Sequence, residues 1–205
     1  MTTKSAAAPG RAGGYTLIEL LTVLAIAGVL LSTGVPALGG WLLDGRRTAV
    51  ANDLLATFLL ARREGATLGR SVVVCGVLDG NRNGTIDPGE QRCSGADWSD
   101  GWMIATWSDA NGNSVIDASE LKPVRIFTTG AAGRLTVRAG NFSSSPPIRP
   151  RAAVVMKGAG MHTSNGTITV CDRRGAPGAR AVILSWTGRA RVSSRSASGG
   201  PLTCP

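Results

Sequence analysis

The sequence has 205 residues, of which 43% are hydrophobic and 17% are charged. This length suffices for one ordinary domain with an additional element, and the hydrophobic content argues against a disordered chain. The 28 glycines and 10 prolines are too many for a long all-helical bundle. The single histidine, His162, has no recognisable catalytic partner motif, so we expect a protein without enzymatic activity.

Charge is distributed unevenly along the chain, whose formal net charge is +9. Residues 1–120 hold 9 Lys and Arg against 12 Asp and Glu, whereas residues 121–205 hold 13 against one acid, Asp172. Such a basic C-terminal part predicts a polyanionic partner, namely nucleic acid, anionic lipid or an acidic protein. The alternative is a basic surface that serves only solubility.

An apolar segment follows a short basic leader. Residues 1–14 are polar with two basic side chains, and residues 15–43 carry one charge, Glu19. The segment is long enough to span a bilayer. A signal peptide is cleaved after its apolar region, but here the small pair Gly13-Gly14 precedes it. We therefore expect a retained single-pass anchor with a cytoplasmic N-terminus and an exported C-terminal part.

Glu19 is unusual in such a segment, because a carboxylate in a membrane helix costs about 2.5–3.5 kcal/mol on insertion scales. If the chain is cleaved after Gly14, the new amine lies on Tyr15, and Glu19 of a neighbouring copy is a suitable partner for it. The alternative is that Glu19 lies at the membrane interface, near the end of the segment.

The stretch GYTLIELLTVLAIAGVLLSTGVP resembles the class III leader and N-terminal helix of type IV pilins and pseudopilins. The resemblance implies that prepilin peptidase cuts after Gly14 and N-methylates Tyr15, where the family usually has Phe. The family's essential glutamate falls on Glu19 and its helix-bending proline on Pro36. It also implies an inner-membrane protein with a periplasmic head, which later assembles with other pilins or pseudopilins into a filament.

The helix is expected to continue beyond the membrane over residues 44–69. Val50, Leu54, Phe58 and Ala61 recur at helical spacing with charged residues between them, which predicts an amphipathic helix that docks on a sheet. Gly69 is a suitable end of this helix. Bends or melted turns are expected at two places, namely Pro36 and Gly39-Gly40.

The head, residues 70–205, reads as short β-favouring runs separated by Gly, Asn, Asp, Ser and Pro. The expected strands are 71–78, 101–108, 123–129, 134–140, 166–172, 179–186 and 188–193. Residues 143–150 are a loop or a break between two sheets, and 195–205 form a loose tail. A long helix followed by strands predicts an α+β fold in which the helix packs on an antiparallel sheet.

The strand region resembles the GspH/FimT-like minor pilins. The resemblance rests on two segments, WSDGWMIATWSDANGNSVIDASELKPVRIF, with its W-x-x-G-W segment, and NGTITVCDRRGAPGARAVILSWTGRARVS. The resemblance implies the pilin fold and a minor subunit at or near the tip of a type IV pilus. The alternative is a minor pseudopilin of a type II secretion system, similar to protein H, acting in protein secretion.

Four cysteines stand at 75, 93, 171 and 204, without a C-x-x-C pair. Wide spacing and one histidine argue against a zinc site, and an exported domain favours disulfides. Of the three possible connectivities we favour Cys75–Cys93 and Cys171–Cys204, because each closes a local loop. Each such loop is worth about 3 kcal/mol. Buried free thiols are the alternative.

Two Asp/Asn-rich segments follow the spacing of a calcium-binding EF-hand loop. The first offers Asp79, Asn81, Asn83, Asp87 and Glu90, and the second Asp109, Asn111, Asn113, Asp117 and Glu120. In the second, Ser114 replaces the glycine of the sharp turn. Neither is flanked by a helix pair, and Asx-Gly turns also close hairpins without metal. We expect that no cofactor is required, with Ca²⁺ as a candidate ligand.

Arginines near the C-terminus form the candidate binding surface. Arg189 and Arg191 fall on one face of a strand, after Gly188. Guanidinium groups suit phosphates, and Gly-Arg-x-Arg resembles the DNA-binding motif of FimT-type pilins used in natural transformation. The remaining candidates for contacts with double-stranded DNA are Arg195, Arg173, Arg174 and Arg180. An edge strand protected from aggregation by positive charge is the alternative. Trp186 is a candidate for base stacking, or a core or rim residue.

Overall fold

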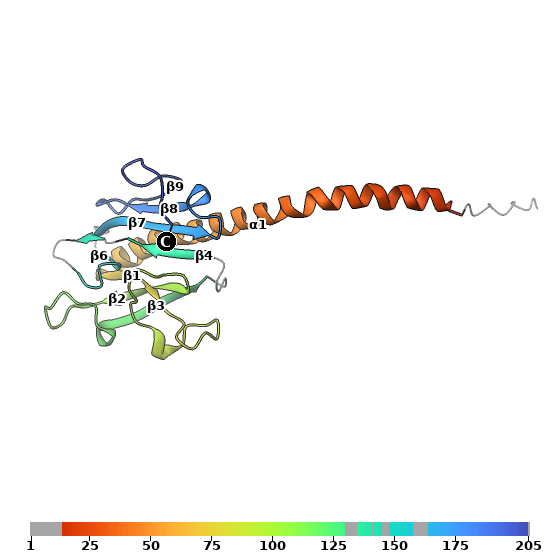
Figure 1. Cartoon of the computed structure of the whole chain (residues 1–205). Coiled ribbons are helices and arrows are strands. Elements are labelled where there is room, and N and C mark those ends of the chain that lie inside the picture. The colour runs from red at the N-terminus through yellow and green to blue at the C-terminus, as the bar shows by residue number, and fades with distance from the viewer. Residues whose placement is uncertain (1–13, 130–134, 141, 145–147, 158–163, 205) are drawn as a thin grey trace, which may run out of the picture. The chain divides into compact units, whose positions relative to one another are not determined.

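The computed structural model describes residues 14–129, 135–140, 142–144, 148–157 and 164–204. The chain divides into two units, residues 1–42 and 43–205, and Figure 1 shows the elements in colour along the chain. Helix α1, Leu17–Leu68, begins in the first unit and ends in the second. None of the described side chains of the first unit is buried within this chain.

Helix α1 is long and apolar enough to cross a membrane. Among the described residues, no other helix meets this criterion of length and composition. The helix is unbroken through Pro36, Gly39 and Gly40. The chain is therefore not melted at the positions where the sequence predicts a bend or a melted turn.

The last turns of α1 are amphipathic, as predicted. Val50, Leu54, Phe58 and Ala61 are all buried, one above the other on a single face of the helix. The helix ends at Leu68, and Gly69 follows with a φ of +61°, a left-handed conformation that glycine adopts without strain. The predicted end of the helix is confirmed.

The strands of the second unit form two antiparallel sheets. The first has the order β3-β2-β1-β6, and the second has the order β4-β7-β8-β9 with β5 paired to β7. The strands are β1 Val72–Val77, β2 Gly101–Trp107, β3 Leu121–Thr128, β4 Leu135–Ala139, β5 Ser143–Ser144, β6 Val154–Met156, β7 Ser164–Asp172, β8 Arg180–Leu184 and β9 Ala190–Ser193. The α+β class with an N-terminal helix on antiparallel strands is confirmed.

Two strands were not predicted from the sequence. β6 has three residues and β5 has two, which is too short for a period-two pattern to stand out. β6 is a full partner of β1, with Val72 opposite Met156. β3 begins at Leu121, before the expected start, because the pairing with β2 continues past a bulge at Val124 of β3, so that Lys122 pairs with Thr106.

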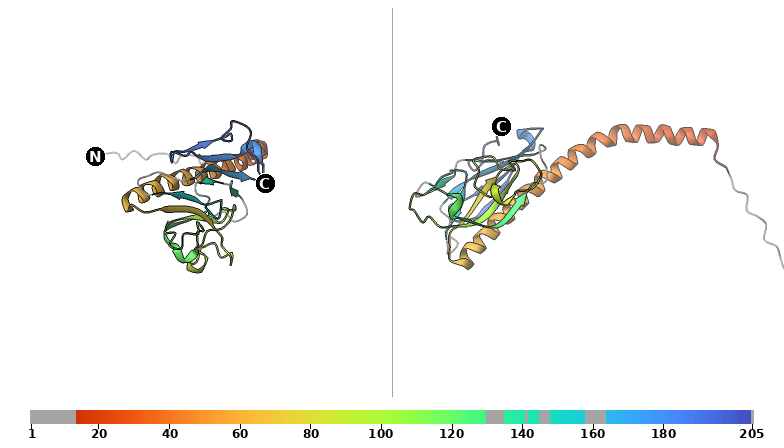
Figure 2. Two further views of the ribbon diagram at one scale, coloured as in Figure 1. Left: turned by 90° about the vertical axis from the view of Figure 1, so that its left-hand side faces the viewer. Right: turned by 90° about the horizontal axis from the view of Figure 1, so that it is seen from below.

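A single core joins α1 to both sheets. The buried face of α1 packs against alternate residues of each sheet, including Val74 and Ile104 of the first and Ile168 and Val182 of the second. Figure 2 shows the helix running along the strands. The other face of the first sheet is covered by loops that carry Ile116 and Ile148. The other face of the second sheet, here called the outer face, is covered in part by the C-terminal tail through Leu202.

Both favoured disulfides are present. Cys75 is bonded to Cys93 and Cys171 to Cys204, with Cα–Cα distances of 5.4 and 6.0 Å. The second bond fixes the tail on the outer face. All buried residues of the described chain lie at or after Arg47, so the second unit contains its own core and both disulfides. The structure thus extends the head from the expected residues 70–205 to residues 43–205, which include the last turns of α1, and we treat this larger head as a unit that folds on its own.

Candidate nucleic-acid interface

The β8–β9 hairpin carries the arginines of the C-terminal motif, and its turn is held by backbone hydrogen bonds. The N–H of Gly188 donates to the carbonyl of Ser185 at 3.0 Å, and the N–H of Ser185 donates to the carbonyl of Arg189 at 3.0 Å. Gly188 has a φ of +75°, a conformation that side chains rarely adopt. The glycine of the motif therefore makes the turn that brings Arg189 to the start of β9.

Strand alternation places the arginines of β9 on the outer face. Ala190 and Val192 pack against the core between α1 and the sheets, so Arg191 points the other way and is exposed. Arg191 lies opposite Ile183 of β8, which belongs to the cluster on the outer face. Arg189 is also exposed, directly before the strand. The predicted sharing of one face by Arg189 and Arg191 agrees with this alternation.

A further arginine of this face was not selected from the sequence. Arg138 of β4 is exposed and lies opposite Thr169 of β7, and one row of pairs continues from Thr169 through Ala181 to Ser193 of β9. Arg138 thus shares the outer face with Arg191. It also lines a cavity of about 570 Å³ between β4, β7 and the tail. Only the pairing of distant strands reveals it, because nothing near Arg138 in the sequence resembles the C-terminal motif.

The remaining arginines differ in what surrounds them. Arg195 is exposed after β9, and its side chain donates to the carbonyl of Gly199 at 3.3 Å. Arg173 is exposed in the turn after β7. Arg180 lies opposite Val170, on the side of the sheet that faces α1, and is half-buried. Arg180 therefore does not extend the outer face. We define the arginine face as Arg138, Arg189, Arg191 and Arg195.

Arg174 takes part in a network of four charges. Its Nη2 lies 2.7 Å from both Asp44 Oδ1 and Asp172 Oδ2, and Arg47 Nε lies 3.0 Å from Asp172 Oδ2. Arg47 also pairs with Asp44. The Asp172 and Arg47 side chains are 0% and 4% exposed. This network connects α1 to the turn after β7. Because the Arg174 guanidinium is ion-paired within the protein, we do not count it among the residues available to a ligand.

The network shifts the pKa values of three of its members, Asp44, Asp172 and Arg174. Arg174 bonded to both carboxylates lowers the pKa of Asp172 and of Asp44 below the ordinary aspartate value. The same bonds raise the pKa of Arg174 above its ordinary range. Asp44, Asp172 and Arg174 are therefore charged at neutral pH.

The N-terminal motif shows a helix cap that was not predicted. Thr16 and Glu19 flank the first turn of α1, and the N–H of Glu19 donates to Thr16 Oγ1 at 3.3 Å. The N–H of Thr16 donates in turn to Glu19 Oε2 at 3.5 Å. This reciprocal pair is a capping box, whose T-x-x-E signal is present in the sequence. Gly14 and Tyr15 precede the helix, and Pro36 lies within it.

The two Asp/Asn-rich loops adopt related conformations, and several of their side-chain oxygens accept hydrogen bonds within the loop. In the first, the Asp79 carboxylate accepts from the N–H groups of Asn83 and Gly84, and Asp87 Oδ2 accepts from Asn81 and Asn83. In the second, Ser114 takes the left-handed conformation of the missing glycine, with a φ of 57°. Carboxylate and amide oxygens suit Ca²⁺, but among the described residues no three acidic, His or Cys side chains converge. His162 lies outside the described residues.

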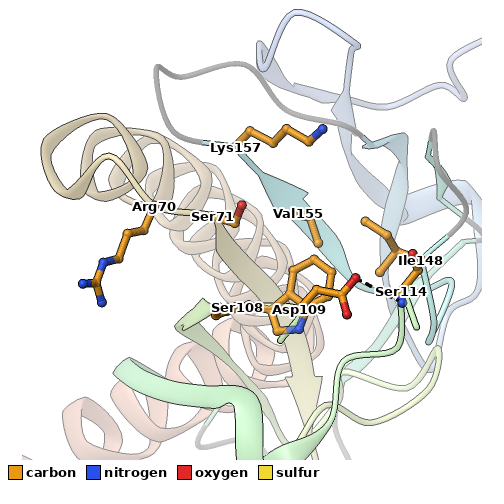
Figure 3. Close-up of a pocket in the computed structure, with 9 residues that line it drawn as sticks. Arg70, Ser71, Ser108, Asp109, Ser114, Ile148, Val155 and Lys157 are labelled. Atoms are coloured by element: carbon orange, nitrogen blue, oxygen red, sulfur yellow. Dashed lines mark hydrogen bonds between the residues drawn. The ribbon is translucent and has the colours of Figure 1, made fainter. Parts of the chain in front are cut away.

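A second cavity, of about 670 Å³, lies beside the start of β1 and the end of β2. Figure 3 shows Asp109 accepting from the N–H of Ser114, at 3.1 Å, while the Arg70 side chain extends away from Asp109. The other Asp109 oxygen is buried without a hydrogen-bond partner in the described part of the chain. Two basic side chains, Arg70 and Lys157, line this cavity together with Asp109 and three serines.

Comparison with known proteins identifies the family. The profile described as "Type II transport protein GspH" matches residues 50–188, and the profile of the prokaryotic N-terminal methylation motif matches residues 10–35. The chain belongs to the GspH family. No curated protein sequence matches the chain. The GspH match covers the amphipathic part of α1 and all strands up to the β8–β9 turn.

Two solved structures are similar to this GspH-family chain, both of the type IV minor pilin FimU of Pseudomonas aeruginosa. One is 18% identical, with a TM-score of 0.49 over 78% of this chain and 96% of that chain. The other is 18% identical, with a TM-score of 0.46 over 77% and 99%. The GspH profile and the N-terminal methylation motif together indicate a structural pilin or pseudopilin. The methylation motif with the apolar helix indicates membrane anchoring and processing by prepilin peptidase.

Proposed function

We propose that this chain is a minor type IV pilin, located at or near the tip of the filament, that binds DNA through its arginine face. The supporting observation is the placement of Arg138 and Arg191 on the outer face of one sheet, with Arg189 and Arg195 at the two ends of β9. Residues 173–205 contain six arginines and no acidic residue. Such a surface attracts a polyanion and binds phosphates without reading the base sequence.

In this proposal the N-terminal unit performs assembly and the head performs binding. Prepilin peptidase removes residues 1–14 and methylates Tyr15, and the apolar helix remains in the inner membrane, with the head in the periplasm, until the filament forms. Glu19 then leaves its capping contact with Thr16 and neutralises the amine of a neighbouring subunit. Movement of the filament would carry bound DNA during natural transformation, without a chemical step on this chain.

A second candidate is a minor pseudopilin of a type II secretion system. The name of the matching family profile favours it. In that case the outer face would contact other pseudopilins or an exported protein, and the arginines would contribute through acidic partners. The two candidates share processing and assembly, so only the ligand of the outer face separates them.

Binding of the head, residues 43–205, to a 20-base-pair duplex across a salt series tests the proposal. Each phosphate contact contributes about −0.9 to the slope of log affinity against log salt. The double variant Arg189→Ala/Arg191→Ala should therefore bind weakly and show a slope smaller in magnitude by about 2. The matched control is Arg62→Ala/Arg63→Ala, which removes the same charge from exposed positions of α1.

The control pair should leave the slope within about half of one contact of the unchanged head. If both double variants weaken binding equally, the head acts only through its net charge and the arginine face is not a site. If the unchanged head does not bind duplex at low salt, the secretion candidate becomes the better explanation.

A further inference from the structure

Trp186 differs from every other tryptophan of the head in its exposure. Trp186 is 52% exposed to solvent, whereas Trp98, Trp102 and Trp107 are at most 9% exposed. Burying a large apolar side chain stabilises a protein by about 1.5–3 kcal/mol. The head forgoes part of this stabilisation at Trp186, which suggests that the indole serves another contact.

The turn that carries Trp186 is well ordered by its own bonds. Ser185 and Thr187, on either side of the indole, share a hydrogen bond between their hydroxyls at 2.9 Å. Ser185 Oγ also donates to the carbonyl of Arg189 at 3.2 Å. The backbone of the turn that presents Trp186 is therefore held before binding, so less conformational entropy is lost there when a ligand covers the indole.

The surroundings of Trp186 are cationic. Arg189 and Arg191 follow it within five residues and are exposed, and the nearest acid before it in the sequence is Asp172, which is ion-paired. Proteins that bind single-stranded nucleic acid combine an aromatic ring, on which a base stacks, with cations that follow the backbone.

We propose that Trp186 stacks on an unpaired base and that the head therefore prefers single-stranded DNA to duplex. The inference rests on the proposed function, since it assumes that Arg189 and Arg191 hold the adjacent phosphates. The bases of a duplex are already stacked on one another, so the indole reaches a base face there only by unstacking the helix. An unpaired base offers its face at no such cost.

Affinity of the head for a 20-nucleotide single strand and for the matching duplex, at one salt concentration, tests this inference. Trp186→Ala should weaken single-strand binding by roughly 5-fold or more, the effect of losing one stacked base, and leave duplex binding within about 2-fold. Trp186→Phe should retain most of the single-strand affinity, because the phenyl ring still stacks. Leu78→Ala, an exposed apolar residue outside the hairpin, is the matched control.

Tryptophan fluorescence gives a second readout on the same protein. The other tryptophans of the head are nearly fully buried, so quenching by acrylamide reports mainly on Trp186. Bound single strand should protect the indole from acrylamide, and bound duplex should not.

The outcomes separate this inference from the proposal that it extends. Loss of all DNA binding in Arg189→Ala/Arg191→Ala, with both affinities unchanged in Trp186→Ala, would overturn the stacking role and keep the arginine face. Equal loss of single-strand and duplex binding in Trp186→Ala would also overturn the stated preference. Unchanged DNA affinities together with weaker association with other pilin heads would assign the turn to a subunit contact instead.

Discussion

Asp172→Asn should destabilise the head strongly. The substitution preserves the shape of a side chain that is 0% exposed, but it removes the negative charge that faces Arg47 and Arg174. Arg47 is itself 4% exposed, so its charge stays buried with less compensation. Removing one partner of a buried ion pair costs about 3–5 kcal/mol. We expect the lower end, about 3 kcal/mol, because Asp44 remains in contact with both arginines.

Thermal unfolding of the head by circular dichroism measures this effect. For a chain of this size about 1 kcal/mol corresponds to about 2–4 °C in Tm, so Asp172→Asn should lower the Tm by about 6–12 °C. The matched control is Asp53→Asn on the exposed side of α1, which should stay within about 2 °C of the unchanged head. An equally small shift for Asp172→Asn would refute the claim that this network supports the fold.

The stability that Asp172 contributes should depend on pH. The pKa of Asp172 is lowered in the folded head, chiefly by its bonds with Arg174, from the ordinary value of 3.8. A lowered pKa contributes stability that is present above the unfolded value and is lost as the pH falls through the folded value. The Tm difference between the unchanged head and Asp172→Asn should therefore be full at pH 7 and shrink below about pH 4. A difference that stays constant down to pH 2 would contradict this assignment.

Three further predictions concern the same head. Gly178→Ala should destabilise it by about 1–3 kcal/mol in denaturant titrations, since a Cβ there would collide with the Arg47 guanidinium; an unchanged midpoint would show that Arg47 moves aside freely. Cys171→Ser/Cys204→Ser, which opens a loop with a sequence separation of 33, should cost about 2–4 kcal/mol by the same titration and free the tail for proteolysis. Treatment with EGTA should change the Tm by less than about 2 °C, because the Asp79 and Asp87 oxygens accept hydrogen bonds within their loop; a larger drop would mean that bound Ca²⁺ holds it.

Much of the fold could be predicted from patterns among residues that are close in the sequence. The spacing of Val50, Leu54 and Phe58 predicted the buried face of α1, and Gly69 predicted its end, because helix periodicity and a left-handed glycine are properties of neighbouring residues. The disulfides were predicted from the expected export of the domain, and their pairing from the local loops that they close. The short strand β6 escaped detection, since three residues do not establish a period.

The charged network could not be predicted in the same way. Asp44 and Arg174 are 130 positions apart, and their contact depends on how β7 lies beside α1. Arg174 was therefore predicted from the sequence to contact DNA, whereas in the structure it forms ion pairs with two carboxylates. Arg138 shows the converse, because the register of β4 on β7 adds it to a face that the C-terminal motif alone defined. Which residues of distant strands share a face can be inferred only once the order and register of the strands in the sheet are known.

If this GspH-family chain is a processed filament subunit, intact-mass measurement of the chain recovered from native membranes or filaments will show it. We expect a chain that lacks residues 1–14 and begins with N-methylated Tyr15. Replacing Gly14 with a bulkier residue should leave the leader in place and the chain out of filaments. A mature chain that begins at Met1, or one cut after the apolar segment of α1, would contradict the account.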